Sequence, residues 1–112
     1  MYLPRVFIPQ IIERWDESSE RFVPSFDFTS AASYGTLTKI LDKEDNPLYL
    51  ARITGKIRKA LADYSPEDFF VAVGDPSVIA ICAGLILRRT NNLKLLKWDK
   101  KLARYIALDI QV

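Results

Sequence analysis

Residues 69–90 read FFVAVGDPSVIAICAGLILRRT, and this stretch decides the class of the fold. The run FFVAV is apolar at every position, which is typical of a strand covered on both faces, as in a parallel sheet. Gly74 ends the run. Asp75 then suits the cap of a helix and Pro76 its first position. The stretch therefore predicts a buried strand, a tight turn and a helix that runs to about Arg89.

The flanking residues extend this pattern to strand, helix, strand, helix, strand. Before it, Thr36–Leu41 reads as a strand, and Asn46 and Pro47 begin a helix whose apolar residues recur at helical spacing up to Ser65-Pro66. After it, Leu93–Trp98 reads as another strand. Such alternation requires right-handed crossovers and a mostly parallel sheet.

Hairpins are predicted at both ends of this core. Arg5–Trp15 and Arg21–Phe28 read as antiparallel strands around a polar loop. Pro9 interrupts the first, which fits an edge strand and not a central one. At the other end, Leu93–Trp98 pairs with Arg104–Ile110. The order is β-β-β-α-β-α-β-β, and we expect a single α/β domain over residues 1–112, with a mostly parallel central sheet, two main helices and antiparallel hairpins at the edges.

The two hairpins share a sequence signature. Residues 14–28 read RWDESSERFVPSFDF and residues 97–110 read KWDKKLARYIALDI. In each, a Trp ends one strand, an Asp begins the turn and can bond its own backbone two residues on, and an Arg opens the return strand. The Trp can pack against the Phe or Tyr that follows. We interpret the repeat as a device for the edges of the sheet, which requires Trp15 and Trp98 to be buried. The alternative is that both are exposed anchors for a partner.

Composition excludes several functional classes. Hydrophobic residues make up 49% and charged residues 27%, which argues against disorder. One cysteine and no histidine leave no disulfide, no zinc or iron–sulfur site and no histidine base. No glycine-rich phosphate loop is present. The pairs Glu44-Asp45 and Glu67-Asp68 lie in polar connections, where we expect solvated charge. We expect no cofactor, no metal and no catalytic residue, so an enzyme has no positive support.

Charge is distributed unevenly along the chain. Residues 1–50 carry 5 basic and 8 acidic side chains, whereas residues 51–112 carry 11 basic and 6 acidic ones, for a net charge of +2. This asymmetry could form an electrostatic surface, although solvated helix faces and turns are the favoured explanation. The N-terminus lacks a signal-peptide pattern, and the longest apolar run, Val78–Leu87, is about half of a membrane span. We therefore expect a cytoplasmic protein with no membrane partner.

The turn Gly74–Ser77 is the most site-like stretch, because it lies where a parallel strand ends and a helix begins. A small-ligand or phosphoryl site at Gly74, Asp75 and Ser77 is one hypothesis. Against it, Pro76 removes an amide from the helix N-terminus, and Asp75 places a negative charge where a phosphate would lie. Helix capping explains the turn without a ligand.

The second predicted helix is apolar nearly all round, whereas a surface helix should carry a polar stripe. Either another part of the chain covers its outer side, or the helix is an interface between copies. The candidate oligomer interface comprises Val78, Ile81, Cys82 and Leu85. Burial within the chain is the alternative.

Basic residues near the C-terminus raise the question of nucleic-acid binding, because cations interleaved with aromatic residues are typical of such surfaces. The candidates are Lys94, Lys97, Lys100, Lys101 and Arg104. Strand alternation, however, puts many of them on different faces, and Trp98 and Tyr105 can pair across the hairpin. Nucleic-acid binding is therefore the alternative to protein binding.

The segments RWDESSERFVPSFDF, NPLYLARITGKIRKALADYSPEDFFVAVGDPSVIAICAG and LKLLKWDKKLARYIALDIQV occur in this order. Together they resemble a group of small proteins of tailed bacteriophages, including T7-like phages of cyanobacteria. The resemblance covers most of the chain. It implies expression inside an infected bacterial cell and an accessory or host-modulating role, and it carries over no catalytic residues. We therefore expect a non-catalytic interaction protein that acts as a homo-oligomer and binds a protein partner, which the host can supply.

Overall fold

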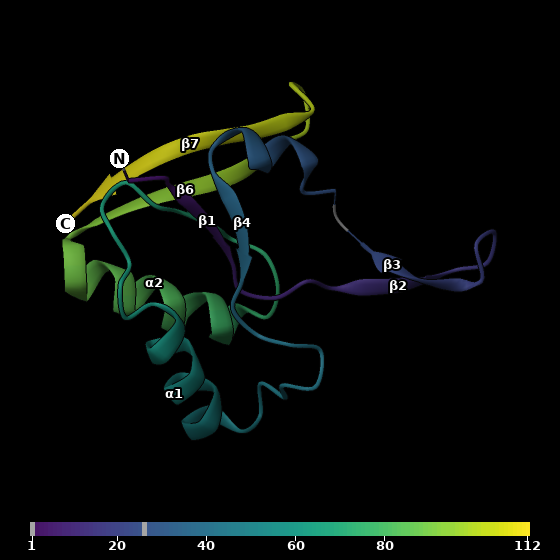
Figure 1. Ribbon diagram of the computed structural model, residues 1–112, viewed down its shortest axis with the longest axis horizontal. Coiled ribbons are helices and arrows are strands. Elements are labelled where there is room, and N and C mark those ends of the chain that lie inside the picture. Colours follow the sequence, from purple (N-terminus) through teal and green to yellow (C-terminus); the bar gives the residue numbers. More distant parts are fainter. Residues whose placement is uncertain (1, 26) are drawn as a thin grey trace.

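The computed structural model describes residues 2–25 and 27–112. Its elements follow in the order β1 (Arg5–Ile8), β2 (Glu13–Asp16), β3 (Arg21–Pro24), the 3₁₀ helix η1 (Thr29–Ser33), β4 (Thr36–Lys39), α1 (Leu50–Ala60), β5 (Phe69–Val71), α2 (Pro76–Thr90), β6 (Asn92–Asp99) and β7 (Arg104–Gln111). Five strands form one sheet in the order β4-β1-β5-β6-β7 (Figure 1). The first four are parallel and β7 is antiparallel to β6. The predicted α/β fold with a mostly parallel sheet and two main helices is confirmed.

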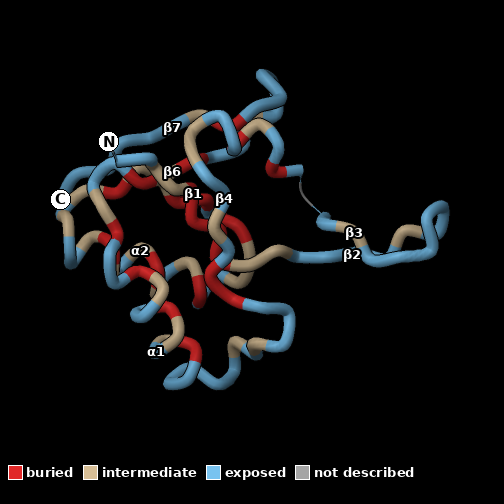
Figure 2. Tube along the Cα trace, viewed as in Figure 1, coloured by how far each residue is buried: buried red, intermediate tan, exposed pale blue. Residues whose placement is uncertain are grey.

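Two hydrophobic clusters cover the two faces of this sheet. On one face, α1 and α2 lie side by side and pack against Phe7 and Phe70 of the central strands. On the other face, Phe28 and Ala31, from the segment around η1, pack against Val71. Strand β5 is therefore buried on both faces, as the apolar run FFVAV predicts. Figure 2 shows the buried residues concentrated in the main sheet and its helices, whereas β2 and β3 are mostly exposed.

The first predicted strand, Arg5–Trp15, is two strands, and its assignment to a sheet edge is wrong. Strand β1 lies inside the sheet, between β4 and β5. Pro9 follows its last residue, Ile8, so the missing amide of the proline falls beyond the paired residues, while the Pro9 carbonyl still accepts a hydrogen bond from Leu41 N at 3.1 Å. A proline at the end of a strand thus gives the same sequence pattern as a proline in an edge strand.

The N-terminal hairpin is also placed differently from the prediction. Strands β2 and β3 pair only with each other and form a separate two-stranded sheet, which we call the arm (residues 13–24). Figure 1 shows the arm extending away from the body. The return strand ends at Pro24, short of the predicted Phe28, and Phe26 lies outside the described residues. The C-terminal hairpin, β6 and β7, extends the edge of the main sheet as predicted.

The shared signature produces the same local structure twice. Trp15 pairs with Phe22 and Trp98 with Tyr105, and both aromatic pairs meet edge to face at 5.3 and 5.1 Å. An Asp opens each turn and accepts a hydrogen bond from the amide two residues on. The packing across the hairpins is therefore confirmed. The expected burial is not, because Trp15 is 51% and Trp98 43% exposed.

Each turn ends in a residue with left-handed backbone, Glu20 (φ 53°) and Ala103 (φ 51°). An L-residue other than glycine loses about 1 kcal/mol there, so we expect Ala103→Gly to raise the free energy of unfolding by up to about 1 kcal/mol, less the added entropy of the unfolded chain. The matched control is Ala107→Gly within β7, which should lower it by about 0.5–1 kcal/mol. Urea unfolding measures both. Equal destabilisation by the two substitutions would show that the left-handed backbone costs Ala103 nothing.

The two helices begin differently. Asn46 and Pro47 form a turn instead of the first helical residues, with Asn46 Oδ1 accepting from Leu48 N at 2.9 Å, so α1 begins later than predicted, at Leu50. Helix α2 begins at Pro76 as predicted. Asp75 caps it, its Oδ1 accepting from Ser77 N at 2.9 Å.

Candidate functional site

A cleft of about 790 Å³ opens at the carboxyl ends of β1 and β4, between the arm and the loop that follows β4. The chain leaves β1 toward the face that η1 covers and leaves β4 toward the face that α1 covers, so the connections diverge between these two neighbouring strands. In open α/β sheets, ligands bind in the crevice at such a point. The topology therefore singles out this cleft as the candidate site.

The cleft combines apolar and charged surfaces. The apolar lining comprises Ile11, Ile12, Phe22, Pro24 and Leu41. The charged lining comprises Glu13, Lys39, Asp42, Lys43, Glu44 and Asp45. Four carboxylates against two ammonium groups make the cleft acidic.

Lys56 of α1 binds two carboxylates of the loop that follows β4 (residues 42–45). Its Nζ lies 2.9 Å from Asp42 Oδ2 and 2.6 Å from Asp45 Oδ2, and Asp42 N donates to Asp45 Oδ2 at 2.7 Å. Hydrogen bonds from Lys56, and then from Lys39, lower the pKa of Asp42. Hydrogen bonds from Lys56, and then from Asp42 N, lower the pKa of Asp45. Both carboxylates therefore stay ionised at neutral pH.

The arm continues the cleft surface outward. Phe22 and Pro24 of the arm line the cleft, and Trp15 lies opposite Phe22 in the register, on the same face of the arm. Phe22 is 64% exposed. An exposed pair of aromatic side chains next to a cleft is a feature typical of protein-binding surfaces. The repeat in the sequence predicted the aromatic pair, but no pattern in the sequence placed it beside a cleft.

At the predicted ligand turn, Gly74, Asp75 and Ser77 are occupied by structural contacts. Gln10, which follows β1, places its Oε1 2.7 Å from Asp75 N, and a Cβ built on Gly74 would lie 2.5 Å from that same oxygen. Asp75 caps α2 through Ser77 N. Gln10 thus fills the space beside this turn. Capping accounts for Asp75 and Ser77, and the positive φ of 107° with the close approach of Gln10 accounts for Gly74.

The predicted oligomer interface on α2 is divided between core and surface. Val78 and Cys82 are fully buried in the core, so these two cannot contact another chain, and the prediction is wrong for them. Burial raises the pKa of the Cys82 thiol to about 12. Ile81 and Leu85 pack against the same core and are only partly exposed. Burial within the chain therefore explains most of the apolar pattern of α2.

The basic residues near the C-terminus lie on different surfaces. Lys94 lies over the Phe69 ring, 5.5 Å from its centre. Lys97 follows Lys94 by three residues in β6 and therefore points to the opposite face of the sheet. Lys100, Lys101 and Arg104 gather at the turn between β6 and β7 and are exposed. The structure therefore brings together three of the five candidates.

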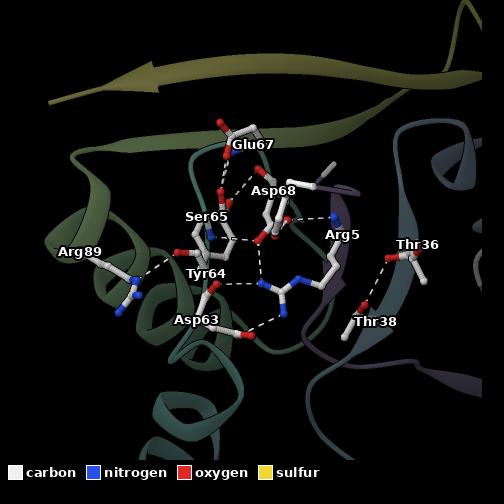
Figure 3. A network of polar contacts seen from close by, with 10 residues as sticks. Arg5, Thr36, Thr38, Asp63, Tyr64, Ser65, Glu67, Asp68 and Arg89 are labelled. Atoms are coloured by element: carbon white, nitrogen blue, oxygen red, sulfur yellow. Dashed lines mark hydrogen bonds and ion pairs between the residues drawn. The ribbon is translucent and has the colours of Figure 1, made fainter.

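A further polar cluster, missed by the sequence reasoning, joins β1 to the segment before β5 (Figure 3). Asp68 is fully buried, contrary to the predicted solvated charge, and its carboxylate accepts from Arg5 Nη2 at 2.9 Å and Ser65 N at 2.9 Å. Arg5 Nη1 also reaches Asp63 Oδ1 at 3.0 Å. The cluster lies at the amino ends of the strands, away from the cleft. Its groups satisfy one another except for Arg5 Nε, which is buried and has no hydrogen-bond partner within the described residues. We therefore assign this cluster a role in stabilising the fold.

The comparisons with known proteins identify the family alone. None of the helices within the described residues is long and apolar enough to cross a membrane. Neither a curated protein nor a solved structure matches the chain. The model of the phage Pam3 gp32-like protein family, however, matches residues 4–112. Because this match covers nearly the whole chain, the protein belongs to the phage Pam3 gp32-like protein family.

Proposed function

We propose that this phage protein is a non-catalytic accessory protein that binds a protein partner in the cytoplasm of the infected bacterial cell. The observation that carries the proposal is the arm, with Trp15 and Phe22 exposed in an edge-to-face pair beside an acidic cleft with an apolar lining. Aromatic residues dominate the energy of protein interfaces, and charged groups at the rim select the partner. The partner segment would carry basic and apolar side chains.

The charged groups of the cleft favour binding over catalysis. A general acid or base works best when its pKa lies near the operating pH. The pKa values of Asp42 and Asp45 are instead lowered by their ion pairs with Lys56. Such carboxylates remain ionised at neutral pH but are paired with lysines. Glu13 and Glu44, which form no ion pair within the described residues, are the charges that attract a basic segment.

The proposal is tested by replacing the aromatic pair, Trp15→Ala with Phe22→Ala, in tagged protein expressed in the host bacterium. Because the pair is exposed, the fold should be retained, and partners captured by the wild type should be lost or reduced about tenfold or more, as expected for anchor residues. Tyr49→Ala is the matched control, since Tyr49 is 66% exposed and lies outside the cleft. Quantitative mass spectrometry of the captured proteins measures the outcome.

Nucleic-acid binding is an outcome of the same experiment. If nuclease treatment abolished capture, and if Lys100→Ala with Lys101→Ala reduced it while the arm variant did not, the basic turn would be a nucleic-acid surface and the proposal would be wrong. Capture that survives nuclease and depends on Trp15 and Phe22 supports the protein partner.

A further inference from the structure

The two hairpins that share a design carry opposite charges. The arm contains four acidic and two basic side chains, a net charge of −2. The second hairpin ends in residues 97–104, which we call the basic tip, with four basic side chains and one acidic, a net charge of +3. In Figure 1 the arm and the turn between β6 and β7 lie apart, and none of residues 97–104 lines the cleft of the same chain.

We propose that the cleft binds the basic tip of a second copy of this chain. This inference rests on the proposed function, because it takes the cleft to be a protein-binding surface and names its occupant. The contact joins two different surfaces, so every copy offers one cleft and one tip. Such head-to-tail contacts generate rings when the rotation closes and open chains when it does not.

Charge complementarity supports this occupant. On the cleft side, Glu13 and Glu44 are exposed and form no ion pair within the described residues. On the tip side, Lys100 and Lys101 are exposed and are likewise unpaired across residues 2–25 and 27–112. Opposite charges that lack partners within one chain gain them between two chains, and their mutual attraction steers the encounter.

Apolar groups on the basic tip match the apolar lining of the cleft. Trp98 is 43% exposed although its ring packs against Tyr105, and Leu102 at the turn is also exposed. On the cleft side, Ile12 and Phe22 are exposed. Contact between the two surfaces would remove these side chains from water, which supplies the attraction that charge alone does not.

The test uses complementary charge reversals in the full chain, followed by sedimentation velocity. The tip variant is Lys100→Glu with Lys101→Glu, and the cleft variant is Glu13→Lys with Glu44→Lys. Wild type should associate at low salt and less at high salt, because screening weakens exposed ion pairs. Each variant alone should associate about tenfold more weakly or not at all, since it sets like charges against each other. An equimolar mixture of the two variants should associate again.

A matched control is Arg58→Glu with Lys59→Glu, which makes the same charge change on an exposed part of α1 and should leave association unchanged. Wild type that stays monomeric at both salt concentrations would overturn the inference, as would a mixture that fails to associate. The proposed function fails separately. If the chain is monomeric but still captures host protein through Trp15 and Phe22, the proposed function stands and this inference is wrong. If the chain associates with itself but captures no host protein through the arm, the contact between copies stands and the proposed host partner is wrong.

Discussion

Replacing Asp68 with Ala is expected to lower the free energy of unfolding by about 3–5 kcal/mol, the usual cost of removing one partner from a buried ion pair. The Asp68 carboxylate is fully buried and accepts hydrogen bonds from Tyr2 Oη, Arg5 N and Ser65 N, besides its ion pair with Arg5 Nη2 at 2.9 Å. Its removal leaves these donors and part of the guanidinium charge without an acceptor. Urea unfolding at neutral pH measures the loss.

Asp63→Ala is the matched control. Asp63 also pairs with Arg5, at 3.0 Å, but its side chain is 76% exposed, so its removal should cost less than about 1 kcal/mol. If the two substitutions cost the same, burial would not be what makes the Asp68 ion pair important for stability.

The same carboxylate predicts how stability depends on pH. Burial by itself would raise the pKa of Asp68, but hydrogen bonds from Tyr2, Ser65 N and Arg5 bring that pKa below its ordinary value of 3.8. The stability that Asp68 contributes is therefore fully present above pH 3.8 and is lost as the pH falls through the lower pKa of the folded state. Asp68→Asn has no carboxyl group to protonate at this position, so its stability lacks this dependence on pH. The difference in unfolding free energy between wild type and Asp68→Asn should therefore shrink as the pH falls below 3.8.

The elements that sequence patterns predicted correctly are those whose structure is determined by residues close together in the sequence. The short apolar run that contains β5 is typical of a strand covered on both faces, and Asp75-Pro76 suits the cap and the first position of a helix. The pairing of Trp98 with Tyr105 follows from the length of the turn between them. In each case the residues that decide the structure lie within a few positions of one another.

The elements that were missed depend on pairing between distant segments. Strand β1 is bounded by Pro9 in the same way whether it lies at an edge or, as in this protein, between β4 and β5. Alternation in the arm is the same for a hairpin inside a sheet and for one that stands alone. Asp68 follows a turn in a polar stretch, and only its meeting with Arg5, far away in the sequence, shows that it is buried.

The candidate site was missed for the same reason. The cleft is assembled from the end of β1, the arm and the loop after β4, and no one of these segments carries a motif. The sequence offered Gly74–Ser77 as a ligand hypothesis because of its position at the end of β5, beside the favoured explanation of helix capping. It could not show that Gln10 occupies that space and that the open crevice lies on the other side of β1.

Gly74→Ala is expected to lower the free energy of unfolding by about 2–4 kcal/mol, the sum of two separate costs. The first is conformational, because Gly74 has φ 107°, which an L-residue with a side chain adopts only under strain. The second is steric, because the new Cβ would lie 2.5 Å from Gln10 Oε1 and 3.1 Å from Gln10 Cβ. Gly55→Ala in α1 is the matched control. A Cβ there meets nothing within 4 Å, so the same substitution should raise stability by about 1 kcal/mol.

A double-mutant cycle with Gln10→Ala separates the two costs of Gly74→Ala. Truncating Gln10 removes the atoms that the new Cβ would meet, together with the hydrogen bond from Asp75 N at 2.7 Å. The cost of Gly74→Ala should therefore fall by about 1–2 kcal/mol in the Gln10→Ala background, whereas the conformational cost remains. Because Gln10 also lines the cleft, that coupling would show that one side chain both closes the crevice beside β5 and shapes the open one beside β4. Strict additivity of the two substitutions would mean that Gln10 moves aside freely and does not fill the crevice.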